Sequence, residues 1–316
     1  MSTKKIITVF GATGAQGGGL ARAILQDADG EFAVRAVTRD AQSDRAKELA
    51  QMGAEVVEAD MGKVEDLKRV MNGAYGAYCV TFFWAHYSPE KEMAEAKNFA
   101  EAAKKAGLQH VIWSTLEDTR ILVPLSDDRM PTLNEKYKVP HFDGKGASDH
   151  FFTDAGVPTT FLLTAFYWEN FLYFGMGPKR GKDGKLAITL PMGDKKLVSI
   201  SAEDIGKCAF GIFKKGTALV GKRVGIAGDD LTCDEMAEAF SRALGEEVKY
   251  NAVTPEMYRS FGFPGADDLG NMFQYYQEFE KEFSEARDVH YSRELNPSLQ
   301  SFEMWLETNA KKLPLD

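Results

Sequence analysis

Five glycines fall within nine residues directly after the first apolar run of the chain, and they constrain the fold more than any other feature. Three of them have G-x-x-G-x-x-G spacing between a predicted strand and a predicted helix. In this pattern Gly11 allows a tight turn, Gly14 lets the backbone approach a pyrophosphate, and Gly17 permits close helix–strand packing. The helix start offers free N–H groups and the positive end of its dipole to phosphates. A simple tight turn is the alternative interpretation.

The first half of the chain alternates short apolar runs with segments of helical periodicity, which is typical of βαβ units around a parallel sheet. Strands are predicted at Lys5–Phe10, Phe32–Thr38, Glu55–Ala59, Ala74–Val80, His110–Ser114 and Thr159–Thr164. Helices are predicted near 16–28, 42–52, 63–72, 89–106 and 143–155. We therefore expect an α/β fold, with a Rossmann-type doubly wound parallel sheet and a smaller, mixed α+β C-terminal domain. The predicted Rossmann domain is 1–165, with 195–228 returning to it, and 166–316 forms mainly the smaller domain.

Local signals are strongest for the helix predicted at 89–106. Ser88 suits the N-cap, Pro89 the first helical position and Gly107 the position after the helix. By contrast, 115–140 holds three prolines and few periodic apolar residues, so it is predicted to be a long loop of the kind that often serves function. Beyond Gly184, strands are predicted near 185–190, 197–200 and 223–227, and helices near 202–214, 231–244, 255–261, 266–283 and 298–309.

Charge and cysteine content exclude several function classes. A net charge of −9 makes the chain a poor non-specific binder of nucleic acid or anionic lipid. Cys79, Cys208 and Cys233 match no zinc or redox spacing, so we expect reduced, buried thiols. The longest run without charged side chains, 70–89, contains polar residues and glycines and does not read as a membrane span. We expect a cytoplasmic or nuclear protein without a signal peptide, a membrane partner or direct nucleic-acid contact.

The end of the second predicted strand is where such folds select the adenosine ribose. An NAD site places an acid there, about 20 residues past the glycines. This chain has Arg39, whose guanidinium suits a 2′-phosphate. The adjacent Asp40 leaves NAD open, and a solvated surface arginine is the alternative interpretation. We expect NADP(H).

Other strand ends are expected to line the same crevice, because open α/β sheets bind ligands at the carboxyl ends of their strands. Asp60 and Met61 are predicted near the adenine, although Asp60 serves equally well as the N-cap of the next helix. The residues predicted further along the crevice are Thr81, Phe82 and Phe83 beside the cofactor, and Ser114 and Thr115 near the nicotinamide. The histidines His86, His110, His150 and His290 share no metal-ligand spacing, so no metal site is predicted.

Five blocks of sequence together resemble the NmrA-like family of atypical short-chain dehydrogenases, closest to its NADP(H)-responsive redox sensors. The blocks are Gly11–Gly18, Arg39, His141-Phe-Asp-Gly-Lys145-Gly, Tyr167-Trp-Glu-Asn170 and Phe261–Phe273. The resemblance implies an NADP(H)-binding Rossmann domain, a smaller C-terminal domain and regulatory protein partners. It also implies cofactor contacts at Gly11, Ala12, Thr13, Gly14, Ala15, Gln16, Arg39, Thr81, Phe82, Phe83, Lys145, Tyr167, Trp168, Glu169 and Asn170. A further cofactor-contacting lysine of the family falls at Ala94 here.

Lys145 raises the question of catalysis. Active short-chain dehydrogenases pair a tyrosine, which moves the substrate proton, with a lysine four residues later that holds the nicotinamide ribose. Here the earlier position is His141, expected on the same helical face. Histidine is suited to proton transfer, so His141 is a candidate acid; a packing or capping role at a helix start is the alternative. Lys145 keeps its ribose-holding role in either case.

The missing tyrosine favours a cofactor sensor with little or no turnover that regulates protein partners. In this hypothesis cofactor occupancy orders the 115–140 loop and the C-terminal domain. The alternative is an NADPH-dependent reductase of a small carbonyl, quinone, enone or imine, assisted by Lys145 and either His141 or Tyr167. The third hypothesis is a structural interaction module, and a homodimer is compatible with each. One further set of side chains is expected to pack internally or against a partner: Tyr275, Tyr276, Phe279 and Phe283.

Overall fold

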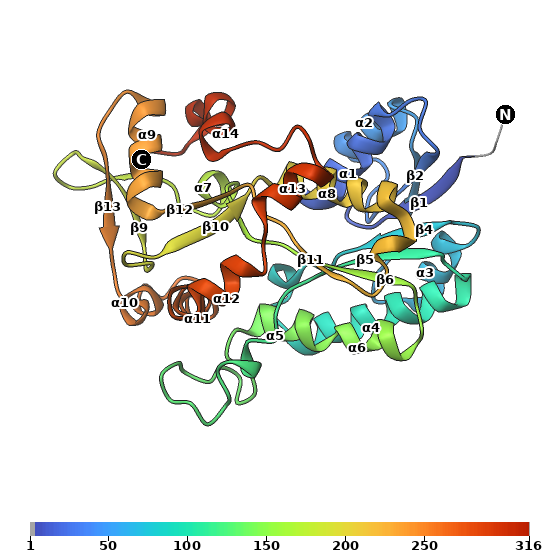
Figure 1. The fold of residues 1–316 in the computed structure, drawn as a ribbon, viewed down its shortest axis with the longest axis horizontal. Helices are drawn as coiled ribbons and strands as arrows, with labels where there is room; N and C mark the ends of the chain where they lie inside the picture. The colour runs from blue at the N-terminus through green and yellow to red at the C-terminus, as the bar shows by residue number, and fades with distance from the viewer. Residues whose placement is uncertain (1–3, 316) are drawn as a thin grey trace.

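The computed structural model describes residues 4–315 and confirms an α/β fold (Figure 1). In its first half the strands are β1 (Lys5–Val9), β2 (Phe32–Thr38), β3 (Glu55–Glu58), β4 (Gly76–Cys79), β5 (His110–Thr115) and β6 (Thr159–Leu163). The helices between them are α1 (Ala15–Gln26), α2 (Asp44–Gln51), α3 (Val64–Met71), α4 (Pro89–Ala106), α5 (Pro140–Ala147) and α6 (Asp149–Asp154). The expected alternation of strands and helices is therefore confirmed.

The main sheet has seven parallel strands in the order β11-β6-β5-β4-β1-β2-β3, with β11 at Arg223–Gly225. The chain reverses direction across the sheet between β1 and β4, where Ile7 pairs with Val34 on one side and with Gly76 on the other. In a doubly wound sheet the ligand crevice lies outside the carboxyl ends of the strands at this switch point. The glycine-rich segment follows β1, so the fold places it at that edge.

Helices cover both faces of the main sheet (Figure 1). On one face α1 packs against α8 (Ala202–Lys215), and on the other α3 and α6 pack against α4. The α1–α8 contact is made by backbone, because a Cβ on Gly206 would lie 2.1 Å from the amide nitrogen of Leu20 and one on Gly19 2.4 Å from the carbonyl oxygen of Glu203. Residues beyond 166 thus complete the sheet and one of its helical layers, whereas the predicted domain boundaries stay a prediction.

The rest of the chain forms two small mixed sheets and a set of helices, as predicted for the C-terminal domain. Their strands are β7 (Phe166–Tyr167), β10 (Lys196–Ile200) and β12 (Asp229–Thr232) in one sheet, and β8 (Lys179–Arg180), β9 (Leu186–Leu190) and β13 (Val248–Ala252) in the other. The helices are α7 (Asn170–Tyr173), α9 (Cys233–Leu244), α10 (Pro255–Ser260), α11 (Ala266–Glu278), α12 (Glu280–Glu285), α13 (Val289–Leu295) and α14 (Phe302–Asn309). The helix predicted from 231 begins at Cys233, because Thr232 ends β12 and forms a capping box with Glu235.

The helix predicted at 89–106 is confirmed with its caps. The amide of Lys91 donates to the Ser88 hydroxyl at 3.2 Å, Pro89 occupies the first turn, and Gly107 has a φ of 65°. The segment predicted as one helix at 143–155 is instead two helices, α5 and α6, which meet at Ser148. Pro140 opens α5, as its fixed φ and missing N–H favour at a helix start.

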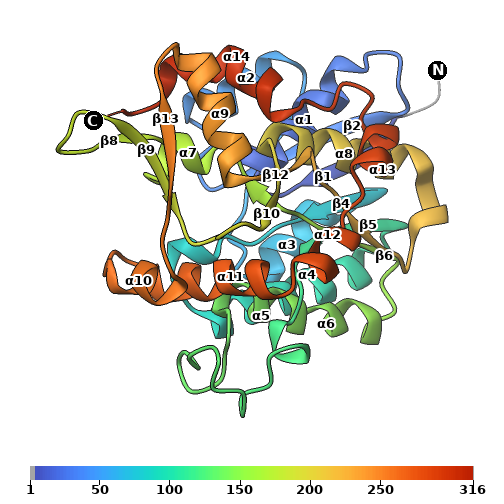
Figure 2. The ribbon, with the colours of Figure 1, turned by 60° about the vertical axis from the view of Figure 1, so that its left-hand side comes forward.

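The long loop predicted between β5 and α5 is present, and it is held against α11. The Asn271 amide group donates to the carbonyl oxygens of Pro131 and Lys138, at 2.8 and 2.6 Å. The Gln274 amide group donates to the carbonyl oxygen of Arg129 at 2.8 Å. Figure 2 shows α11 lying beside α5 with this loop beneath them. Tyr275, Tyr276 and Phe283 pack around Phe142. Of the two predictions for this aromatic set, packing inside the chain is therefore the one that the structure has.

The three cysteines are buried and unpaired, as expected. Burial raises the pKa of the Cys233 thiol to about 12 and also raises those of Cys79 and Cys208, so all three stay protonated at neutral pH. No helix within residues 4–315 is both long enough and apolar enough to cross a membrane.

Candidate dinucleotide-binding site

The glycine loop has the geometry that its spacing predicts. Gly11 adopts a φ of +63°, and its carbonyl oxygen accepts the amide of Gly14 at 2.8 Å, which closes the tight turn. A Cβ on Gly17 would lie 2.5 Å from the carbonyl oxygens of both Phe10 and Gly11, so only glycine allows helix and strand to approach so closely here. Gly11 and Gly14 are exposed, which leaves their backbone open to a ligand.

The first turn of α1 has neither a side-chain cap nor an acidic residue, a combination that among the α-helices of residues 4–315 recurs only in the four-residue α7. Gly14 is its N-cap residue, and the turn holds no acidic side chain. By comparison, α4 and α9 are capped by the hydroxyls of Ser88 and Thr232. The free N–H groups and dipole end of α1 therefore point into the crevice without an intramolecular acceptor, which fits a phosphate group. Beside this turn, Ala12 is buried and the carbonyl oxygen of Thr13 accepts from Arg45 at 3.1 Å.

Arg39 follows the carboxyl end of β2 directly, and its side chain is exposed. Within residues 4–315 it makes no hydrogen bond or ion pair. The neighbouring Asp40 carboxylate is engaged locally, since it accepts the amide of Gln42 at 2.8 Å. The guanidinium is thus free to meet an anionic ligand, whereas the carboxylate already stabilises a turn.

Asp60 and Met61 lie after β3, next to the end of β2. The alternative that Asp60 caps the next helix is wrong, because Lys63 is the N-cap residue of α3. Asp60 instead accepts the amide of Gly62 at 2.9 Å, and the carbonyl oxygen of Met61 accepts from Asn98 at 3.1 Å. Both remain at the crevice edge on the side of Arg39.

Gln16, the second residue of α1, forms hydrogen bonds with side chains from distant parts of the chain. Its amide group donates to the Tyr167 hydroxyl in β7, and its amide oxygen accepts from the hydroxyls of Tyr78 in β4 and Ser114 in β5, the latter at 2.8 Å. Burial raises the pKa of Tyr78 and Tyr167, so both phenols are neutral at physiological pH. Sequence reasoning expected cofactor contacts at Gln16 and Tyr167 but not their contact with each other.

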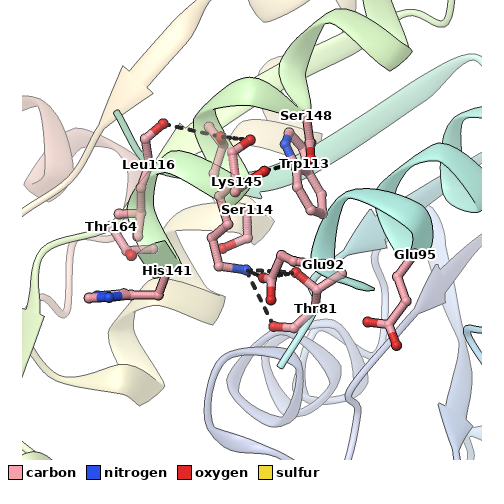
Figure 3. Close-up of polar contacts among 12 residues, drawn as sticks. Thr81, Glu92, Glu95, Trp113, Ser114, Leu116, His141, Lys145, Ser148 and Thr164 are labelled. Carbon is pink, nitrogen blue, oxygen red and sulfur yellow. Dashed lines mark hydrogen bonds and ion pairs between the residues drawn. The ribbon is translucent and has the colours of Figure 1, made fainter. Parts of the chain in front are cut away.

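Lys145 lies in a cluster of side chains that sequence reasoning found only in part (Figure 3). Its Nζ donates to the Thr81 hydroxyl at 2.7 Å and forms an ion pair with Glu92 Oε1 at 2.5 Å. Nζ also lies 5.5 Å from the centroid of a Trp113 ring. The predicted neighbours Thr81 and Lys145 are thus brought together, and Glu92 was missed.

Glu92 is completely buried, although it carries a carboxylate. It shares the inner face of α4 with Ala96 and Phe99. An acid at a position of the apolar stripe was the available signal, because such residues are almost never buried unless they are paired. Its Oε2 has no hydrogen-bond partner within residues 4–315 and lies 4.0 Å from Nε2 of His86, which is equally unpartnered there.

The structure does not join His141 to Lys145. In Figure 3 the imidazole of His141 extends away from the Lys145 ammonium group. His141 Nδ1 lies 2.6 Å from a carboxylate oxygen of Asp268, and its backbone amide donates to the other oxygen at 3.2 Å. The ring also lies 4.9 Å from that of Trp84 and forms no hydrogen bond through Nε2 to any residue in 4–315. The prediction of one shared helical face missed Asp268, which is 127 residues away.

The side chains of Trp168 and Glu169 are hydrogen-bonded to the C-terminal region, and their cofactor contacts stay a prediction. The Trp168 side chain is fully buried, and its indole N–H donates to Ser199 at 2.8 Å. Glu169 accepts the amide of Ala202 at 2.8 Å at the start of α8, and burial raises the pKa of its carboxyl. The physical reason is that β7 pairs with β10, which turns the following residues into the C-terminal core. Asn170 begins α7 and is half-buried.

Phe82 and Phe83 differ in how exposed their side chains are at the crevice. Phe82 is half exposed, whereas Phe83 is buried against the rings of Trp84 and His141. Phe82 is therefore the one of the two that remains open to a bound molecule.

Comparison with known proteins places this geometry in a family. The NmrA-like family profile matches residues 3–306. The NmrA-like family domain-containing oxidoreductase FrzB of Cladobotryum sp is 29% identical over 295 residues, covering 86% of this chain and 84% of its own. An NmrA-like family domain-containing protein of Dictyostelium discoideum is 28% identical over 265 residues, covering 81% and 82%.

Solved structures agree with the sequence matches. NmrA, described as a negative transcriptional regulator in complex with NADP, has a TM-score of 0.79 and 26% identity, covering 97% of this chain and 95% of its own. The Citrobacter sp. triphenylmethane reductase complexed with NADP(H) shares the fold at a TM-score of 0.74 and 20% identity, covering 97% and 99%. From its sequence and its fold, the chain belongs to the NmrA-like family.

Proposed function

We propose that this protein binds NADP(H) and acts as a sensor of cofactor redox state, regulating protein partners with little or no turnover. The uncapped turn of α1 and the glycine cradle suit a pyrophosphate. Its relative NmrA is described in complexes with NAD and with NADP and as a transcriptional regulator. Such a sensor would act in the cytoplasm or nucleus on other proteins, without direct nucleic-acid contact.

One observation carries this proposal: Gln16 joins the phosphate-binding turn to the C-terminal region. Its contact with Tyr167 crosses 151 positions of the sequence and links α1 to β7. A dinucleotide that touches the α1 start must therefore meet side chains that also hold the second half of the chain. Binding of a dinucleotide can therefore alter the packing of the C-terminal region without any chemical step.

A second connection runs from the lysine end of the site. α5 carries both Lys145 and His141, His141 contacts Asp268 of α11, and α11 holds the loop between β5 and α5. Coupling between sites requires such contiguous packed elements together with two states that the ligand distinguishes. The path supports the expectation that the loop responds to cofactor.

The preference for NADP(H) over NAD(H) rests on Arg39. It is exposed and without a partner within residues 4–315, at the position that meets the adenosine ribose in this fold class. A planar, bidentate guanidinium suits a 2′-phosphate.

Little turnover is expected because the tyrosine that would work with Lys145 is absent. His141 occupies that position, and its imidazole extends away from the Lys145 ammonium group (Figure 3). No tyrosine hydroxyl within residues 4–315 forms a hydrogen bond with Lys145, and those of Tyr78 and Tyr167 are engaged by Gln16.

Calorimetric titration with NADPH, NADP⁺, NADH and NAD⁺ tests the proposal. We expect the two phosphorylated forms to bind more tightly and to differ from each other, because a sensor needs differential affinity. Limited proteolysis should then show the loop between β5 and α5 protected differently by NADPH and NADP⁺. Absence of dinucleotide binding, or identical digestion and oligomeric state in all ligands, contradicts the sensor.

A reductase is the second candidate, and the His141–Asp268 pair favours it. Curated relatives are named oxidoreductases, among them FrzB. A reduced nicotinamide supplies a hydride when bound. Nε2 is the ring nitrogen of His141 that remains for transfer of the accompanying proton, because Asp268 occupies Nδ1. Its contact with Trp84 and Phe83 suits a flat acceptor such as a quinone, enone or imine.

Absorbance at 340 nm during a screen of quinones, enones, imines and small carbonyls distinguishes the two candidates. Steady NADPH consumption that falls in Asp268→Asn while NADPH still binds supports the reductase. NADPH binding without consumption over the whole panel supports the sensor. If NADPH is neither bound nor consumed, the hypothesis that remains is the structural interaction module.

A further inference from the structure

We propose that dinucleotide binding takes up a proton, and that buried Glu92 holds it on the carboxylate oxygen that faces His86. This inference rests on the proposed function, since it needs a dinucleotide whose ribose engages Lys145. It makes Glu92 the residue that positions Lys145 in the free protein. It also makes the affinity for the cofactor depend on pH.

Glu92 depends on Lys145 for its charge balance. Its carboxylate is completely buried, and Oε1 receives both the Lys145 ammonium group at 2.5 Å and the Thr81 hydroxyl. Oε2 receives nothing from residues 4–315. A buried carboxylate that loses its counter-ion is strongly destabilised. If a ribose hydroxyl draws Lys145 toward the crevice, Glu92 needs another positive charge or a proton.

His86 lies beside the Glu92 oxygen on which that proton can be placed. Its Nδ1 accepts the amide of Ser88 at 3.1 Å, so in the neutral ring the hydrogen is on Nε2. Nε2 faces two carboxylates, 4.0 Å from Glu92 and 3.9 Å from Glu95. Burial lowers the pKa of His86 below its usual value of 6.5, so the ring is neutral in the free protein at pH 7.

The other charged groups around Glu92 and His86 do not replace Lys145. The positive charge of Lys91 on α4 lowers the pKa of His86 and of Glu95, although Lys91 contacts neither side chain. Asp60, in the turn after β3, is negatively charged and raises the pKa of Glu95. Burial, reinforced by Glu92, raises the pKa of Glu95. Within residues 4–315, Lys145 is therefore the only cation in direct contact with the cluster.

The proton balance gives the sign of the effect. When Lys145 moves toward the ligand, one proton leaves a buffer acid and binds Glu92 Oε2, since Nδ1 of His86 already accepts the Ser88 amide and Nε2 already carries the ring hydrogen. Because the bound state holds more protons than the free state, affinity must fall as the pH rises. The limit for one proton is about tenfold per pH unit.

Calorimetry in two buffers of different ionisation enthalpy measures the proton directly. The titrations use the full chain and NADPH at about pH 7.5, where the 2′-phosphate, with a pKa of about 6, is already ionised. We expect net uptake approaching one proton in the wild type. Uptake indistinguishable from zero alongside normal NADPH binding overturns the inference and leaves the proposed function intact. Failure to bind NADPH at all refutes the proposed function instead.

Glu92→Gln keeps the shape of the side chain and its acceptor for Lys145 and removes the charge. We expect NADPH to bind this variant with uptake near zero and with a flattened dependence on pH. Glu101→Gln on the same helix is the matched control, because Glu101 is exposed and pairs with Lys68. Unchanged uptake in Glu92→Gln contradicts the assignment. If that variant does not fold, the wild-type proton count still decides.

Discussion

The two ends of the candidate site are built differently. At the glycine end the chain presents backbone atoms, because Gly11, Gly14 and Gly17 lie close together in the sequence, in the loop after β1 and the first turn of α1. At the lysine end it presents side chains, with Thr81 and Lys145 64 positions apart and Glu92 on a third element. Backbone recognition requires only short-range spacing, whereas the charge cluster exists only once the sheet and its helices have formed.

This difference determines how each end is expected to respond to mutation. The glycine end depends on the space that a missing Cβ leaves, so steric change should damage it. The lysine end depends on charge balance in a buried place, so removal of one charge should damage it more than a change of shape.

The largest effect is expected at the lysine end. Lys145→Met leaves Glu92 buried without its counter-ion, and breaking a buried pair costs about 3–5 kcal/mol. Urea unfolding should show that loss in the free energy of unfolding. Lys68→Met is the control, since its partners Glu65 and Glu101 are exposed and such pairs contribute about 0–1 kcal/mol. Equal losses in the two variants would mean that burial of Glu92 does not govern this end.

Gly17→Ala tests the glycine end. The added methyl would lie 2.5 Å from two carbonyl oxygens, and relief requires backbone movement, with an expected destabilisation of about 1–3 kcal/mol. NADPH binding should be lost as the helix start shifts. Gly18→Ala is the neighbouring control, because its methyl would lie 3.1 Å from the Arg22 guanidinium and 3.2 Å from the carbonyl oxygen of Ala12, which requires much smaller shifts. Tight NADPH binding by Gly17→Ala would show that the close approach is not required.

The contrast between the two ends also explains what the sequence could predict. The glycine spacing, the alternation of strands and helices, and the caps at Ser88 and Gly107 are all short-range signals, and the structure has each of them. The two-residue strand β7 leaves no such signal. Its pairing with β10 carries the Trp168 side chain into the core, which the cofactor contact implied by the family resemblance did not foresee.

The missed site residues share a second physical cause. Glu92 falls on the apolar stripe of α4, but its partners Thr81, which follows β4, and Lys145 of α5 reach it only in the folded chain. Asp268 likewise reads as a helix-start acid until α11 packs beside α5 and meets His141. Identity and spacing predict what one segment does alone, whereas partners across more than a hundred positions depend on the finished packing.

Arg39→Ala sharpens the comparison on the adenosine side. Loss of a charged hydrogen bond of about 1.5–3 kcal/mol should weaken NADPH binding roughly 10–100-fold. NADH lacks the 2′-phosphate, so its affinity should change little, and that second titration is the control. An equal loss for both cofactors would assign Arg39 to the shared part of the dinucleotide, and no loss for either would make it a solvated surface residue.

The smallest effect is expected where the two ends meet. Tyr167→Phe removes the hydroxyl that accepts from Gln16 and leaves the ring in place, which should cost about 0.5–1.5 kcal/mol of unfolding free energy. Tyr173→Phe on α7 is the matched control, since its side chain is 73% exposed and its loss should be near zero. If Gln16 transmits occupancy, Tyr167→Phe should bind NADPH yet show weaker ligand-dependent protection of the loop between β5 and α5. Full protection in that variant would transfer the coupling to the second connection, the His141–Asp268 contact between α5 and α11.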